Sequence, residues 1–240
     1  MLKQTIMIVG NGPISALAAA KTAEASYVIR FNECRSFPEA PGRTDVVAVS
    51  NTGRPGRGMT SSSAWRQHPA VRDASEIWCV RDPEKFAEMR GPLSVSHPDL
   101  HDFCDDYTDG FAAFAAETGK RHRILARSIH EHVDTQLAAF GPPPYIVPSS
   151  GLIVIAAVLQ WFPDRAVALA GFSHQGWEWH PFSAERCLID ALITTGRLQR
   201  LDHDPAEGPS STETGLAGRS AKAAGMMWKQ GTGGSHRGLG

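Results

Sequence analysis

The chain has 240 residues, with 24 Lys and Arg against 25 Asp and Glu, and a formal net charge of −1 at pH 7. This balance gives no electrostatic reason to expect nucleic acid or an anionic membrane as a partner. No apolar run reaches the roughly 20 residues that a membrane-spanning helix needs, so we expect no transmembrane segment.

The first predicted elements form a strand, a turn and a helix. Thr5–Val9 is a short apolar run that predicts a buried strand, and it leaves no room for a signal peptide before it. Gly10-Asn11-Gly12 predicts a turn, and Pro13–Glu24 predicts a helix with Pro13 at its first position. Because the first N–H groups of a helix lack partners, this arrangement predicts an anion site.

A dinucleotide is one interpretation of that site, because the Gly-x-Gly pattern is close to the G-x-G-x-x-G fingerprint. However, Ser15 replaces the third glycine. The next predicted strand, Tyr27–Phe31, carries Arg30 and is followed by Asn32, whereas a ribose diol requires an Asp or Glu at the strand tip. A Rossmann-type protein that binds a flavin or NAD(P) therefore remains an alternative.

Strands and helices alternate along the rest of the chain. This predicts an α/β protein with a Rossmann-like layered fold, in which helices flank a mainly parallel sheet. The further strands are expected at Asp45–Val49, Ile77–Val80 and Ala166–Ala170, and the further helices at Pro83–Met89, Asp99–Glu117, Arg127–Phe140, Gly151–Phe162 and Pro181–Thr195.

Two segments lack an apolar pattern. Asn51–Ser63 is rich in Gly and Ser, and we expect a mobile polar loop there that serves as a lid. The pattern also ends after Leu201, because the chain beyond it is too poor in apolar residues to offset its conformational entropy. We therefore expect one domain over residues 1–201 and a disordered tail over residues 202–240.

Cysteine and histidine placement favours neither disulfides nor a metal site. The four cysteines are scattered and form no C-x-x-C pair, which is typical of reduced thiols in a cytoplasmic protein. His130 and His132 lie two residues apart on a predicted helix, where their side chains point to different faces.

Two further groups of residues suggest a binding or a catalytic role. Ser149 or Ser150 is a natural N-cap for the apolar helix that follows, so Ser149-Ser150-Gly151 predicts either a second anion cradle or only a capped core helix. His180 precedes Pro181, which suits the first position of a helix. The helix dipole there keeps an imidazole neutral near pH 7, as a general base requires. The alternative is that His180 only caps a surface helix.

These residues together resemble glycosyltransferase family 29, the sialyltransferases of eukaryotes and their bacterial relatives. The large sialylmotif of that family has V-G-N and a later V-x-R-x-N. Its small sialylmotif has P-S-T-G before an apolar helix, a strand and G-F, and its very small motif is H-x-x-x-x-E. The matching residues here are Val9-Gly10-Asn11, Val28-Ile29-Arg30-Phe31-Asn32, Pro148-Ser149-Ser150-Gly151, Gly171-Phe172, and His180 with Glu185.

The resemblance implies a sialyltransferase-like variant of the glycosyltransferase-A fold. It also implies transfer of an acidic sugar from a CMP-sugar donor to the hydroxyl of an unidentified glycan or small-molecule acceptor. No metal or other cofactor is implied, because hydrogen bonds that cradle the leaving phosphate can replace a cation. The implied catalytic residues are His180, as base, and Glu185. The implied donor-binding residues are Gly10, Asn11, Gly12, Arg30, Asn32, Ser149, Ser150 and Gly151.

The chain also resembles a short group of bacterial proteins labelled urease operon accessory proteins. That label records a gene neighbourhood and implies no chemistry.

The membrane anchor and the disulfide of animal sialyltransferases are missing, and Trp177-Glu178-Trp179 stands where their aromatic His-Tyr motif would lie. These departures leave open a non-catalytic accessory or nucleotide-binding protein on the same fold.

Overall fold

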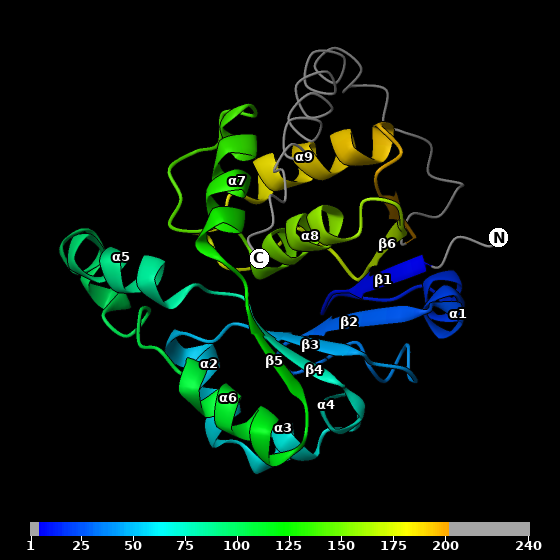
Figure 1. Cartoon of the computed structure of the whole chain (residues 1–240). Coiled ribbons are helices and arrows are strands. Elements are labelled where there is room, and N and C mark those ends of the chain that lie inside the picture. The colour runs from blue at the N-terminus through cyan, green and yellow to red at the C-terminus, as the bar shows by residue number, and fades with distance from the viewer. Residues whose placement is uncertain (1–4, 202–240) are drawn as a thin grey trace, which may run out of the picture.

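The computed structural model describes residues 5–201, which share one parallel sheet with helices on both faces (Figure 1). Seven strands in this range pair in the order β5-β4-β3-β2-β1-β6-β7, and every neighbouring pair is parallel. The predicted α/β class is therefore confirmed. The strands are β1 (Thr5–Val9), β2 (Tyr27–Phe31), β3 (Val46–Val49), β4 (Glu76–Cys79), β5 (Arg121–Ile124), β6 (Ala166–Ala170) and β7 (Gln199–Arg200).

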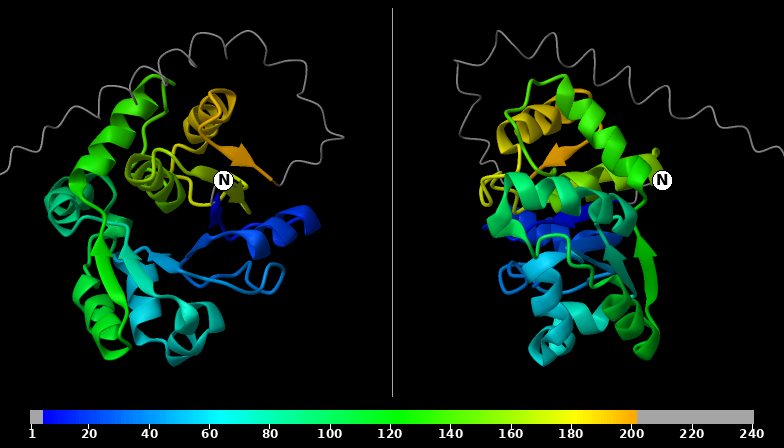
Figure 2. Two further views of the ribbon diagram at one scale, coloured as in Figure 1. Left: turned by 45° about the vertical axis from the view of Figure 1, so that its right-hand side comes forward. Right: turned by 90° about the vertical axis from the view of Figure 1, so that its left-hand side faces the viewer.

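The helices form a layer on each face of the sheet, as the two views of Figure 2 show. Because side chains alternate between faces along a strand, Ile6 and Ile8 pack with α7, α8 and α9, whereas Met7 and Val9 pack with α1. The helices are α1 (Ala16–Glu24), α2 (Gly53–Ser61), α3 (Ser63–Gln67), α4 (Pro69–Asp73), α5 (Pro83–Ser96), α6 (Thr108–Glu117), α7 (Arg127–Ala138), α8 (Ser150–Trp161) and α9 (Phe182–Thr194), with a 3₁₀ turn η1 (Pro98–Leu100).

The predicted polar lid over residues 51–63 is wrong, because this segment contains α2. Gly56 and Met59 are buried, and the N–H of Gly53 donates to Asp105 O at 2.8 Å. Contacts with distant parts of the chain thus impose a helix on a composition that by itself favours a loop. The segment is part of the packed structure at the carboxyl edge of β3.

Three predicted helix boundaries are also wrong. The helix predicted over Pro83–Met89 continues to Ser96 as α5. Helix α1 begins at Ala16 and not at Pro13, because the Ser15 hydroxyl caps it by accepting from the N–H of Ala18 at 3.1 Å. The helix predicted over residues 99–117 is divided into η1 and α6. The break falls where an Asp106 carboxylate oxygen accepts from the N–H of Thr108 at 2.9 Å, at the start of α6.

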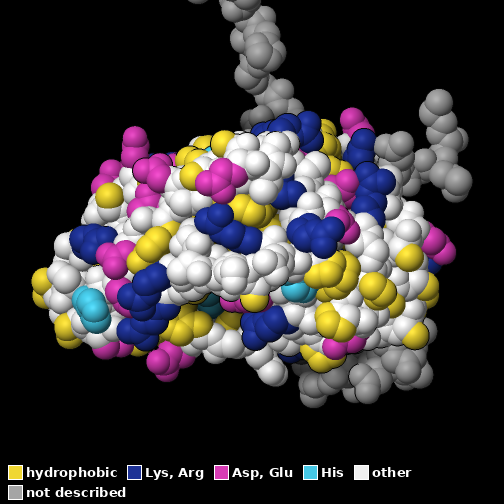
Figure 3. All heavy atoms as spheres, turned by 90° about the horizontal axis from the view of Figure 1, so that it is seen from below, with side chains coloured by type: hydrophobic (Ala, Val, Ile, Leu, Met, Phe, Trp, Pro, Cys, Tyr) yellow, Lys and Arg dark blue, Asp and Glu magenta, His cyan; other side chains and the backbone are white. Residues whose placement is uncertain are grey.

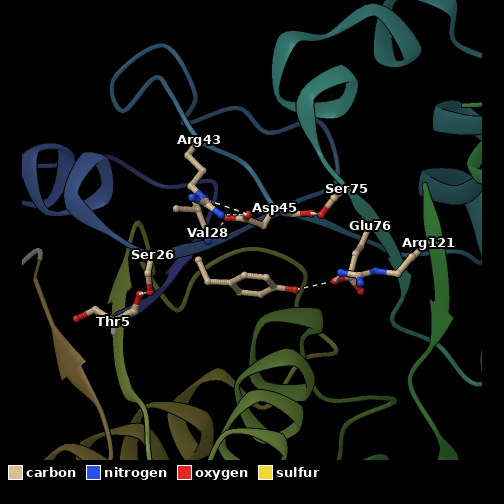
Figure 4. A network of polar contacts seen from close by, with 9 residues as sticks. Thr5, Ser26, Val28, Arg43, Asp45, Ser75, Glu76 and Arg121 are labelled. Atoms are coloured by element: carbon tan, nitrogen blue, oxygen red, sulfur yellow. Dashed lines mark hydrogen bonds and ion pairs between the residues drawn. The ribbon is translucent and has the colours of Figure 1, made fainter. Parts of the chain in front are cut away.

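The amino edge of the sheet is held by a network of polar contacts. Glu76 at the start of β4 pairs with Arg121 at the start of β5 (Figure 4). Glu76 also accepts hydrogen bonds from the Tyr27 hydroxyl and the Trp78 indole. Beside it, Asp45 accepts from the backbone N–H of Val28 at 2.8 Å. These contacts fix the order of strands β2 to β5 and leave the opposite, carboxyl edge to the loops.

On the face that Figure 3 shows, acidic and basic side chains are interspersed. Within residues 5–201 no helix is long and apolar enough to cross a membrane. The tail predicted over residues 202–240 lies outside the described residues.

Candidate functional site

A cleft of about 740 Å³ lies at the carboxyl edge of the sheet. It is lined by residues that follow the strands within two positions, among them Gly10 after β1, Asn32 after β2, Arg81 after β4 and Gly171 after β6. Strand β1 lies between β2 and β6, so the direction of strand order reverses at this point. Open α/β sheets bind ligands at such a switch point, and the volume is typical of small-molecule sites, about 300–1,000 Å³.

The loops that follow β1 and β6 are pressed together through glycines. The N–H of Gly10 donates to Ala170 O at 2.8 Å, and the N–H of Gly12 donates to Gly171 O at 2.9 Å. A Cβ atom on Gly10 would lie 2.3 Å from Gly171 O, so no larger residue fits there without a shift of the backbone. Both N–H groups therefore donate to backbone carbonyls of the protein. They do not form the phosphate cradle that was expected from the sequence.

Asn11 and Asn32 both line the cleft, as the sequence predicted. The Asn11 side chain also donates to Phe31 O at 3.3 Å, and Asn32 Oδ1 accepts from the N–H of Ser50 at 2.8 Å. Asn32 has a φ of 51°, a left-handed conformation that Asn tolerates better than most residues. Both side chains therefore shape the loops at the tips of β2 and β3 as well as face the cleft.

Arg30 does not line the cleft, so its position does not agree with the expected contact to a donor. Its side chain is fully buried, and it donates to Thr44 Oγ1 at 3.0 Å and to Ala40 O at 2.6 Å. The guanidinium also lies over the ring of Phe37, 5.2 Å from its centroid. Side-chain alternation along β2 directs Arg30 to one face of the sheet, away from its carboxyl edge.

The N-terminus of α8 opens into the cleft. Ser149 is the N-cap of this helix, and its hydroxyl accepts from the N–H of Leu152 at 3.3 Å. Ser150 and Gly151, the first two helical residues, line the cleft, and within residues 5–201 their N–H groups make no hydrogen bond. Two free amides at the positive end of a helix dipole are the groups that an anion site uses. Ser149 caps the helix as expected, and whether the loop also binds an anion stays a prediction.

Glu185 of α9 holds this loop in place. One of its carboxylate oxygens accepts from the N–H of Ser149 and the other from the Ser149 hydroxyl, both at 2.6 Å. Glu185 is only 1% exposed, and burial raises the pKa of its carboxyl although the two hydrogen bonds oppose that shift. Since both oxygens are occupied, Glu185 positions the start of α8.

His180 presents a free ring nitrogen to the cleft. Its Nδ1 lies 2.8 Å from Val147 O, and because a carbonyl only accepts, Nδ1 carries the proton. In the neutral ring Nε2 is then the unprotonated nitrogen. Burial, and secondarily the charge of Arg81, lower the pKa of His180, so the ring is neutral near pH 7. Pro181 is the N-cap of α9 and not its first helical residue, which corrects the prediction by one position.

Arg81 is a cleft residue that the sequence analysis missed. It is 7% exposed, its Nη1 donates to Thr52 Oγ1 at 2.6 Å, and its guanidinium lies over the rings of Phe86 and Phe103. Burial lowers the pKa of Arg81 to about 10, which still leaves it charged at pH 7. Its place directly after the predicted strand Ile77–Val80 is the signal that could have found it.

No three His, Cys, Asp or Glu side chains gather within residues 5–201 in a way that could hold a metal ion. His130 is buried on α7, with its Nε2 2.9 Å from Val80 O. Because a carbonyl only accepts, Nε2 of His130 carries a proton. The same ring nitrogen is therefore not available as a metal ligand.

The fold and the cleft define a Rossmann-like α/β protein with a cleft of small-molecule size at the switch point of its sheet. A comparison with models of known protein families gives no match. Over 200 residues the chain is 51% identical to the urease operon 23 kDa accessory protein of Rhizobium meliloti (strain 1021), covering 82% of this chain and 93% of that protein. The chain therefore belongs to the family of the urease operon 23 kDa accessory protein.

Two solved structures of a mammalian sialyltransferase, one in complex with Gal-beta-1-3GalNAc-ortho-nitrophenol, are also similar to this chain. Their sequence identities are 12% and 13%, and each similarity covers 84% of this chain and 70% of the other at a TM-score of 0.48. A TM-score below 0.5 is too low to establish a shared fold or a shared chemistry.

Proposed function

We propose that this protein is a CMP-sugar-dependent transferase of the sialyltransferase type, which moves an acidic sugar to an acceptor hydroxyl with His180 as the base. One observation carries the proposal: His180, whose Nε2 is unprotonated in the neutral ring, lines the same cleft as the open N-terminus of α8. A base and an anion site in one cleft are what a displacement of phosphate from a sugar needs.

In this proposal His180 Nε2 takes the proton of the acceptor hydroxyl while that oxygen bonds to the anomeric carbon of the sugar. The bond from the anomeric carbon to the phosphate oxygen breaks, and CMP leaves with the electron pair. The free N–H groups of Ser150 and Gly151 stabilise the charge that develops on the phosphate. Glu185 acts by positioning Ser149 at the start of the same helix.

A second candidate is a nucleotide-binding accessory protein without turnover, which is compatible with the name of the R. meliloti relative. Both candidates bind CMP, but only the transferase consumes a CMP-sugar. A flavin or NAD(P) protein is less compatible with the structure. The amides of Gly10 and Gly12 are occupied, and α1 begins only at Ala16, so the glycine loop offers no helix N-terminus to a pyrophosphate.

The decisive experiment combines CMP titration by calorimetry with chromatographic measurement of CMP release from CMP–N-acetylneuraminate. Many transferases pass their donor slowly to water, so the assay needs no identified acceptor. We expect His180→Ala to reduce CMP release by about 100-fold while leaving the affinity for CMP nearly unchanged. The control is His122→Ala, which removes a histidine of β5 that does not line the cleft.

The outcomes separate the candidates. Equal CMP release by His180→Ala and the wild type would remove His180 from the mechanism. Binding of CMP by the wild type without any release from the donor would favour the accessory candidate. Absence of CMP binding at millimolar concentration would contradict both.

A further inference from the structure

Arg81 is a buried cation that has no carboxylate partner among residues 5–201. Among the described residues its side chain makes one hydrogen bond, to the neutral Thr52 hydroxyl. Its guanidinium also lies over the faces of Phe86 and Phe103, 5.2 and 4.6 Å from the ring centroids. Aromatic faces attract a cation without neutralising it. Arg81 therefore brings an uncompensated positive charge to the cleft that it lines.

The acidic side chains that line the cleft are occupied elsewhere. Asp102 pairs with Arg54 at 3.0 Å and lies 3.7 Å from Arg57. Both oxygens of Glu185 accept from Ser149. An unpaired buried charge lowers stability, so an anionic ligand that pairs with Arg81 would recover that free energy on binding. Arg30 is also buried, with no carboxylate partner in the part of the chain that the structure describes, but it does not line the cleft.

Arg81 lies at the same end of the cleft as the proposed base. The Phe103 ring beneath its guanidinium stacks on Trp177 with centroids 5.1 Å apart, and Trp177 contacts the ring of His180 at 5.0 Å. The charge of Arg81 also contributes to the lowered pKa of His180. The cation and the base therefore face the same part of a bound ligand.

That placement distinguishes two anionic groups of the donor. The base must lie beside the anomeric carbon, because the acceptor oxygen attacks that atom. In sialic acids and other 2-keto sugar acids the anomeric carbon also bears a carboxylate. The phosphate has its own donors in the N–H groups of Ser150 and Gly151. A guanidinium beside the base is thus best placed for the carboxylate, whose two oxygens match its planar fork.

We propose that Arg81 binds the carboxylate on the anomeric carbon of the donor sugar and makes the cleft selective for acidic sugars. This inference rests on the proposed function. It assigns the carboxylate to Arg81, whereas the family resemblance implies Ser149, Ser150 and Gly151 for the phosphate and the carboxylate together. Of these three residues, Ser149 is engaged by Glu185.

The test measures dissociation constants of CMP and of CMP–3-fluoro-N-acetylneuraminate, a donor analogue that resists hydrolysis, by calorimetry. In Arg81→Gln we expect the analogue to bind about 10- to 100-fold more weakly, as loss of a charge-assisted contact predicts. We expect the affinity for CMP to change by less than about threefold. The matched control is Arg54→Gln, since Arg54 lines the same cleft but is already paired with Asp102; there neither affinity should change by more than about threefold.

Each other outcome overturns the inference. If CMP and the analogue both bind more weakly by the same factor, Arg81 contacts the phosphate. If neither affinity changes, Arg81 has only a structural role. In both cases the proposed function stands. If the wild type binds neither ligand, the proposed function fails as well. Thermal melting without ligand checks the fold, and Arg81→Met, which fills a similar volume without charge, is measured in the same way if Arg81→Gln does not fold.

Discussion

Replacing Glu185 by Gln tests the contact that joins α9 to the start of α8. In the wild type the two carboxylate oxygens accept from the N–H and the hydroxyl of Ser149, each at 2.6 Å. A glutamine keeps the shape but has one oxygen. Its NH₂ group cannot accept from the Ser149 hydroxyl, so the hydrogen bond from that hydroxyl to a charged oxygen would be lost.

The expected cost follows from the burial of this pair. Loss of a hydrogen bond to a charged group costs about 1.5–3 kcal/mol, which corresponds to a fall in Tm of about 3–12 °C for a protein of this size. Burial raises the pKa of Glu185, so removal of the charge returns part of a desolvation cost. We therefore expect the lower half of that range, a fall of about 3–6 °C.

Thermal unfolding followed by circular dichroism measures this change, and calorimetry with CMP measures its effect on the cleft. We expect CMP to bind about tenfold more weakly because the N–H groups of Ser150 and Gly151 lose their alignment. The control is Glu117→Gln, an exposed partner of Arg66, which should change Tm by less than about 1 °C. An unchanged Tm for Glu185→Gln would refute the structural role, and lost turnover with unchanged Tm and CMP affinity would assign Glu185 to the chemistry.

Two further predictions concern the glycine contact and the buried histidine. Gly10→Ala places a Cβ 2.3 Å from Gly171 O. We therefore expect urea unfolding to show a free energy of unfolding lower by about 1–3 kcal/mol, together with weaker CMP binding. The control is Gly58→Ala, in a helix with no atom near the new Cβ, which should instead raise the free energy of unfolding by about 0.5–1 kcal/mol. Burial lowers the pKa of His130 to about 4, so the unfolded chain takes up a proton below about pH 6.5 that the folded chain does not. Stability due to this group is complete above pH 6.5 and falls by about 2–3 kcal/mol toward pH 4.5. His130→Gln, which can still donate to Val80 O, should reduce that fall by the same amount, and an unchanged pH dependence would contradict the assignment.

Local patterns in the sequence were sufficient for most of the sheet. Short apolar runs located β1, β2, β3, β4 and β6 to within a residue at each end, because a strand buried on both faces must be apolar along its whole length. The capping chemistry of Ser149 likewise located the start of α8. These features depend on residues a few positions apart, so they can be recognised without a partner in space.

Strand β5 and helix α2 depended on tertiary structure. Strand β5 consists of Arg-His-Arg-Ile and is largely exposed, so it has no apolar pattern, and it forms because β4 offers it a free edge. Helix α2 is rich in Gly and Arg, and it is stabilised by burial of Gly56 and Met59 against other elements. In both cases the stabilising partners lie far away along the chain.

The site itself divides in the same way. The sequence by itself identified Asn11, Ser150 and His180 as candidates, because each has a local chemical pattern around it. The sequence could not show that the N–H groups of Gly10 and Gly12 donate to carbonyls at the end of β6 and just after it. It also could not show that Arg81 lines the cleft whereas Arg30 does not. Those facts follow from strand order and side-chain alternation, which bring residues from five strand ends to one edge of the sheet. Only the packed sheet decides which of two buried arginines lines the cleft.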